Sequence, residues 1–152
     1  MLKWFVDLLA NIFHRKDAEP KPAPILRREV SGQEIFNALA AKFPEAQIFL
    51  SDNRKWACDI QDIEDFLTLD NTNHEKWRED RFDCDDFAFR LMGQLSVPGY
   101  AELTKALVWT DVHALNGFLD TNLDFWFIEP QGDTISDKLE KWQGSKVRLI
   151  VI

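Results

Sequence analysis

The sequence has little of what would point to metal clusters, disulfides or nucleic acid. It contains only two cysteines, Cys58 and Cys84, and neither lies in a Cys-x-x-Cys pair. Neither a zinc signature nor a disulfide framework is therefore expected, and a reducing compartment is the default. With 18 Lys and Arg against 26 Asp and Glu, the net charge of −8 would repel nucleic-acid phosphates. We expect a cytoplasmic protein that does not bind nucleic acid.

The N-terminal segment is apolar but too short to span a membrane. Residues 1–14 place large apolar side chains at helical spacing. Asp7 interrupts the apolar run and no small-residue cleavage site follows, which argues against a signal peptide. We expect an amphipathic helix that docks on a protein partner or on its own domain, with a membrane surface as the alternative. Residues 15–30, which carry three prolines, are expected to form an extended linker.

Residues 31–152 are enough for one domain, and twelve Phe and six Trp would give it a compact core and an apolar cleft. The capping box of Ser31 and Glu34 predicts a helix that Pro44 ends. Asp59 is placed to start a second helix, and a third helix begins near Cys84. Strand patterns follow at residues 107–118, 123–129 and 146–152. The order predicts an α+β fold, with N-terminal helices followed by a small antiparallel sheet.

The stretch WREDRFDCDDFA, residues 77–88, offers a candidate nucleophile. Cys84, Ala88 and Leu91 fall on one face of the third helix, so Cys84 lies in its first turn. The helix dipole there favours a thiolate, although the adjacent Asp85 and Asp86 oppose it. The alternative is a buried cysteine that acts as a small hydrophobic residue. Cys58 has no such surroundings in the sequence, and we expect it to be structural.

A candidate base and a residue to orient it follow Cys84 in the sequence. His113 lies in the strand pattern of residues 107–118, on the same predicted face as Trp109, and Glu129 closes the next strand pattern. A thiol, an imidazole and a carboxylate are the groups that nucleophilic catalysis needs. A structural histidine in the core is the alternative for His113.

The three motifs WREDRFDCDDFA, VHALNGF and FIEPQ resemble the papain-like protease domain at the C-terminus of mushroom agglutinins of the fairy-ring type. They are also similar to small bacterial and phage proteins that carry this domain without the lectin. The resemblance covers roughly residues 34–152 and implies a papain-like or transglutaminase-like fold. It implies a cysteine peptidase or amidohydrolase acting on a peptide or protein, with Cys84 as nucleophile, His113 as base and Glu129 as orienting residue.

The same resemblance implies a substrate cleft and a metal. Trp77 matches an aromatic that borders the cleft, and Trp109 is a second cleft candidate because it shares the predicted face of His113; a buried tryptophan is the alternative for Trp77. Calcium dependence is implied, and the oxygen ligands would come from Asp85, Asp86, Glu129 and Gln131. Acidic residues that only complement the helix dipole are the alternative.

Two further functions stay open from the sequence. Hydrolysis and acyl transfer to an amine, as in transglutaminases, pass through the same thioester, so the motifs do not separate them. A binding or structural module that keeps the fold without turnover is the third hypothesis, favoured by the docking helix expected at residues 1–14.

Overall fold

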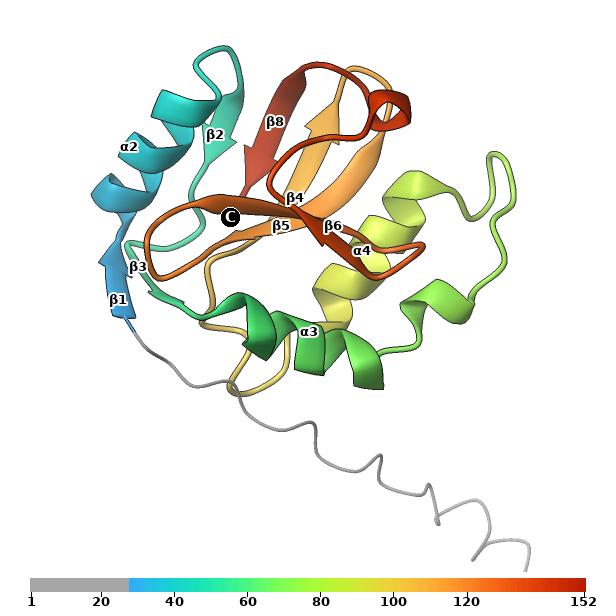
Figure 1. The fold of residues 1–152 in the computed structure, drawn as a ribbon, viewed down its shortest axis with the longest axis horizontal. Coiled ribbons are helices and arrows are strands. Elements are labelled where there is room, and N and C mark those ends of the chain that lie inside the picture. Colours follow the sequence, from blue (N-terminus) through green and yellow to red (C-terminus); the bar gives the residue numbers. More distant parts are fainter. Residues whose placement is uncertain (1–27) are drawn as a thin grey trace, which may run out of the picture.

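The computed structural model describes residues 28–152 (Figure 1). The predicted docking helix, residues 1–14, and most of the predicted linker lie outside the described residues. The elements are, in chain order, β1 (Arg28–Ser31), α2 (Gly32–Lys42), β2 (Gln47–Phe49), β3 (Arg54–Ala57), α3 (Ile60–Leu69), η1 (Thr72–His74), α4 (Cys84–Gln94), β4 (Lys105–Thr110), β5 (Ala114–Leu119), β6 (Phe125–Glu129), β7 (Thr134–Ser136), η2 (Lys141–Gln143) and β8 (Val147–Val151).

Two sheets organise the chain. The larger has six strands in the order β2-β8-β4-β5-β6-β7, and the smaller pairs β1 with β3. The α+β class is confirmed, but the sheet is mixed, because β2 runs parallel to β8 while the other neighbours are antiparallel. The prediction of a linker to residue 30 is wrong at its end, since β1 already pairs with β3 from Arg28 onward.

Each helix begins at a capping residue that lies within three positions of its partner in the sequence. Ser31 caps α2, accepting from the Glu34 amide while the Glu34 carboxylate accepts from the Ser31 amide. Asp59 and Asp83 precede α3 and α4 in the same way. Since each cap satisfies backbone donors that the first helical turn leaves open, the three helix starts were predictable from neighbouring residues alone.

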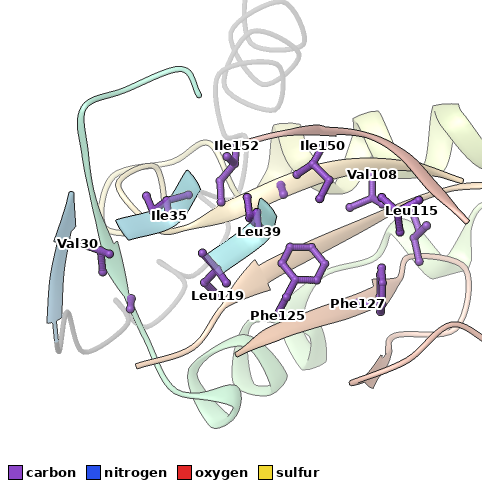
Figure 2. Packing of buried hydrophobic residues seen from close by; sticks show 13 residues of the cluster. Val30, Ile35, Leu39, Val108, Leu115, Leu119, Phe125, Phe127, Ile150 and Ile152 are labelled. Carbon is purple, nitrogen blue, oxygen red and sulfur yellow. The ribbon is translucent and has the colours of Figure 1, made fainter. Parts of the chain in front are cut away.

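Helices cover both faces of the larger sheet. One core cluster joins Ile35 and Leu39 of α2 to side chains of β4, β5, β6 and β8, as Figure 2 shows. The second cluster joins α3 and α4 to the opposite side chains of β5 and β6, including Phe118 and Ile128. In Figure 1, α2 lies beside β2, and α3 and α4 lie away from it. A sheet covered on both faces explains why every residue of β5 is buried.

Gly117 in the middle of β5 is required by close packing. A Cβ atom at this position would lie 2.4 Å from Cζ of Phe125 and 2.8 Å from the carbonyl oxygen of Trp126. The aromatic ring of the neighbouring strand therefore occupies the space of the missing side chain, which lets β5 and β6 pack as one layer.

Two predicted segments differ from the structure. Residues 107–118 were expected as one strand, but they form β4 and β5 with a tight turn between them, and Val112 in that turn is 67% exposed. Residues 131–145, to which the sequence analysis assigned no strand, contain β7 and η2. Within residues 28–152, no helix has the length and apolar character needed to cross a membrane.

Candidate active site

Cys84 and His113 line one pocket on the surface. The pocket has a volume of about 510 Å³. Its lining residues come from the segment before α4, the turn between β4 and β5, the turn after β6 and η2: Trp77, Glu79, Asp80, Asp83, Cys84, Val112, His113, Gln131 and Trp142. Two of the three predicted catalytic residues thus face a shared space that is open to solvent.

The cap of α4 places Cys84 at the first position of this helix. The side chain of Cys84 is partly exposed, while Phe87 and Ala88 behind it are buried. The Asp86 carboxylate accepts from the backbone amide of Asp83 at 3.2 Å, so it closes the helix start. This position exposes the thiol to the positive end of the helix dipole. Cys58, by contrast, is completely buried in the core, as expected of a structural cysteine.

A tight turn, and not a strand, holds His113. The backbone amide of Thr110 donates to the carbonyl of His113 at 2.8 Å, and the His113 amide donates to Thr110 Oγ1 at 2.9 Å. Thr110 Oγ1 in turn donates to the carbonyl of Gln143 at 2.6 Å. The predicted shared strand face of Trp109 and His113 is therefore wrong, because the chain reverses between them.

The buried carboxylate of Glu129, at the end of β6, has three hydrogen-bond partners. Its Oε2 lies 2.8 Å from Nε2 of His113 and accepts a hydrogen bond from Nε2 of Gln143, also at 2.8 Å. Its Oε1 accepts from the backbone amide of Gln131 at 3.3 Å. Because Nε2 of His113 is turned to Glu129, Nδ1 is the ring nitrogen that remains for chemistry in the pocket.

Trp142 and Gln143, which the sequence did not single out, complete the surroundings of His113. The rings of Trp142 and His113 have centroids 5.0 Å apart at 64°. Gly144 follows with φ of 104°, and a Cβ there would lie 2.3 Å from Oδ1 of Asp111. That glycine lets the chain pass close to the turn of residues 110–113 and bring η2 against His113.

Asp83 and Asp85 interact directly beside the thiol. A hydrogen bond between the two carboxyl groups raises the pKa of Asp85, and burial raises it further, while the same bond lowers the pKa of Asp83. One proton shared by two carboxylates explains the opposite directions. Among the described residues, the acidic and thiol groups gathered within 4.8 Å of one another are Asp83, Cys84 and Asp85.

The predicted calcium ligands are only partly brought together. Gln131 lines the pocket of Cys84, and Asp85 is bonded to Asp83 at its edge. Asp86 serves the helix cap, and Glu129 is held by His113 and Gln143. The carboxylate that lies next to that of Asp85 is the one of Asp83, and not that of Asp86.

The two candidate cleft tryptophans have different locations. Trp77 lines the pocket of Cys84 and is 49% exposed, which rules out the alternative of a buried core side chain. Trp109 lines a separate pocket with Arg148 and Leu149, and its ring packs on Phe89 at 5.7 Å. The structure thus brings Trp77, but not Trp109, to the candidate active site.

Known structures share this arrangement of elements. A structure described as the PSL1a–E64 complex superposes with a TM-score of 0.71 at 22% identity, covering 84% of this chain and 51% of that one. A Polyporus squamosus lectin bound to the human-type influenza-binding epitope Neu5Acα2-6Galβ1-4GlcNAc gives a TM-score of 0.65, also at 22% identity, covering 84% and 50%. The fold resembles part of a Polyporus squamosus lectin. No protein-family profile and no curated protein matches the sequence.

The likeness to these structures shows the fold and no more. The chain spans about half the length of the structures it matches. At this identity, the likeness identifies neither a catalytic activity nor a ligand for this chain.

Proposed function

We propose that the chain is a cysteine hydrolase that cleaves peptide or related amide bonds with Cys84, His113 and Glu129. The observation that supports this most directly is the 2.8 Å contact between His113 and Glu129 at the wall of the pocket that Cys84 also lines. A buried imidazole–carboxylate pair beside a thiol at a helix start meets the requirements of nucleophilic catalysis.

The reaction would follow from the roles of these groups. His113 takes the thiol proton through Nδ1 as the Cys84 sulfur bonds to the carbonyl carbon, and the tetrahedral oxyanion forms near the first amides of α4. Collapse breaks the C–N bond, and the amine leaves with the proton from His113. Water then attacks the thioester, His113 removes its proton, and the acid leaves as the thiol is restored. Glu129 keeps the imidazole oriented and stabilises its protonated form throughout.

The carboxylates next to Cys84 would oppose thiolate formation, which is the reason to propose calcium here as well. Asp83 and Asp85 are the residues that would hold it, with Gln131 in the same pocket; these are oxygen donors of the kind that Ca²⁺ prefers. A bound divalent cation would supply positive charge beside the thiol and favour the thiolate. In this proposal Asp86 remains in the helix cap and Glu129 remains with His113.

Thiol labelling and proteolysis together test the proposal. The parent should form a covalent adduct at Cys84 with the epoxide E64 and cleave a denatured protein, and both reactions should be faster with calcium. Cys84→Ala should abolish both, although buried Cys58 remains as a matched thiol. The proposal fails if the parent is inactive with every metal tried, or if Cys84→Ala cleaves equally well.

A carbohydrate-binding module is the second candidate, because a neighbour with this fold is a lectin bound to a sialylated glycan. Glycan-array binding by the Cys84→Ala, His113→Ala double variant would support it if the parent shows no turnover. The chain covers half of that lectin. If the folded parent binds no glycan, this candidate is removed.

Acyl transfer would use the same three residues and differs only in the group that attacks the thioester. Covalent incorporation of a labelled primary amine into a glutamine-rich protein, at the expense of hydrolysis, would assign transfer. Exclusive release of free acid in the presence of excess amine would assign hydrolysis.

A further inference from the structure

Within residues 28–152, one face of β2 and β8 is left partly open to solvent. Side chains alternate between the two faces of a strand, and Ile48, Val108 and Ile150 point towards α2 and the first core cluster. Their neighbours in the sequence point to the opposite face and belong to neither core cluster. We call this surface the outer face, and its residues are Phe49, Leu107, Trp109, Leu149 and Val151.

The outer face is continuous across three strands. The register pairs Val151 of β8 with Phe49 of β2 and with Leu107 of β4. It also pairs Leu149 with Trp109, so the five side chains form two adjoining rows on one side of the sheet. Phe49 is 58% exposed, and the other four are partly exposed. Contiguous apolar surface of this kind marks a place where another segment or molecule binds.

The open strip beside α4 has the width of one helix. α4 packs on β4 and β5, and the ring of its Phe89 contacts Trp109 at 5.7 Å. Helices packed side by side lie about 8–10 Å apart, and two strand spacings of a sheet span about 10 Å. A helix beside α4 would therefore lie over β8 and β2. A pocket of about 310 Å³ that Trp109 and Leu149 line leaves room there for a large apolar side chain.

The sequence of residues 1–14 carries the complementary pattern. Large apolar residues recur there at helical spacing, and Lys3, Asp7 and Asn11 fall on the other side of the predicted helix. An isolated helix of this length is marginal in water, so its apolar side needs a surface to cover. The apolar residues are Trp4, Phe5, Leu8, Leu9, Ile12 and Phe13.

The chain between the two surfaces is long enough to join them. The described chain begins at Arg28, and the amide of Gly32, just after β1, donates to the carbonyl of Asn53 at 2.8 Å. Asn53 follows Phe49 by four positions, so Arg28 lies at most about 35 Å from the outer face. Residues 15–27 span about 40 Å when extended. A tether of this length gives the segment a high effective concentration at the outer face, which favours it over separate molecules.

We propose that residues 1–14 of this chain bind the outer face as an amphipathic helix that lies beside α4, over β8 and β2. The segment is apolar on one side, it is tethered within reach, and the open strip matches the width of a helix. A second copy of the chain and a membrane surface are the competing occupants. The proposal uses neither Cys84 nor His113, so it is independent of the hydrolase activity.

A nitroxide spin label on the polar side of the segment tests the proposal in the full chain. Asp7→Cys provides the labelling position, and Cys84→Ala leaves buried Cys58 as the remaining native thiol. We expect the label to broaden the NMR signals of the Leu149 and Val151 amides. The amides of β7, at the opposite edge of the sheet, should change least. Adding Leu8→Asp and Ile12→Asp should abolish the broadening, because it places charges on the apolar side of the segment.

A matched pair of exposed phenylalanines locates the contact on the domain. Phe49→Ser removes an exposed side chain of the outer face and should remove most of the broadening. Phe36→Ser, at a side chain of α2 that is 43% exposed, is the control and should leave the broadening unchanged. The proposal is overturned if the broadening survives Phe49→Ser, or if Phe36→Ser removes it.

A mixed sample separates the chain's own segment from a second copy. Spin-labelled protein without ¹⁵N is mixed with ¹⁵N-labelled protein that carries no spin label, so that broadening reports only contacts between copies. We expect none in this sample. Broadening as strong as in the singly labelled chain overturns the proposal in favour of a second copy. No broadening in either sample also overturns it, as does broadening that appears only after anionic phospholipid vesicles are added, which would favour a membrane surface.

Discussion

Glu129 and Asp133 are carboxylates four positions apart on one hairpin, yet their surroundings are opposite. Glu129 ends β6 and is held by His113, Gln143 and the amide of Gln131. Asp133 lies in the following turn, has Asn73 as a side-chain partner, and has one buried oxygen that no described residue pairs. The same hairpin thus carries one carboxylate with partners on both oxygens, suited to orient a base, and one with an unpaired oxygen. Partners from distant segments decide the role of each acid.

The largest loss of stability should come from removing the Glu129 carboxylate, whose hydrogen bonds are all made. Glu129→Leu leaves the buried donors of His113 and Gln143 without their acceptor, and each unpaired donor costs about 1–3 kcal/mol. We expect the free energy of unfolding to fall by about 2–5 kcal/mol, which lowers the melting temperature by roughly 5–15 °C. Glu129→Gln, which keeps an oxygen acceptor, is the control and should lose less. If urea denaturation shows the same loss of stability for both variants, the hydrogen bonds of Glu129 do not stabilise this site.

A smaller effect should follow when one donor is removed from the same site. Gln143→Leu takes away the hydrogen bond to Glu129 and the acceptor for the amide of Glu140. The expected loss is about 1–2 kcal/mol of stability. Urea denaturation measures this loss, and an unchanged free energy of unfolding would show that Gln143 does not help to hold Glu129.

The smallest effect on stability is expected at Asp133, the carboxylate with an unpaired oxygen. Because the folded pKa of Asp133 is about 6, above the unfolded value near 3.9, the protonated acid favours the fold. That contribution is fully present below about pH 4 and lost as the pH rises through 6. The free energy of unfolding of Asp133→Asn should therefore gain on that of the parent between pH 4 and 7, by less than about 1 kcal/mol after solvent screening. If urea denaturation gives the same free-energy difference between variant and parent at every pH in this range, the raised pKa of Asp133 is wrong.

Local signals made most of the helices predictable. Ser31, Asp59 and Asp83 each act on backbone groups within three residues, so the helix starts could be read from the sequence. The break between β4 and β5 could not, because Val108, Thr110, Val112 and Ala114 continue the alternation of a single strand. Bonds from Thr110 to His113 and to distant Gln143 decide that turn.

The residues of the candidate site also fall into those that the sequence predicted and those that it did not. The nature and order of Cys84, His113 and Glu129 were visible in the sequence, and the structure brings His113 to Glu129 and to the pocket of Cys84. Trp142 and Gln143 were missed, since they sit in a polar segment and meet His113 and Glu129 only through the folded chain. The unpaired oxygens at Thr72 and Asp133 have no sequence signal at all, because hydrogen-bond satisfaction is a property of the whole fold.

The complete burial of β5 has a consequence for how the molecule opens. Amide hydrogens exchange with solvent only when a segment opens, and a strand covered on both faces opens last. β5 connects the turn that holds His113 to the hairpin that ends in Glu129, and it packs against α4, which begins with Cys84. We therefore expect the three candidate catalytic groups to be attached to one of the slowest-exchanging parts of the described chain.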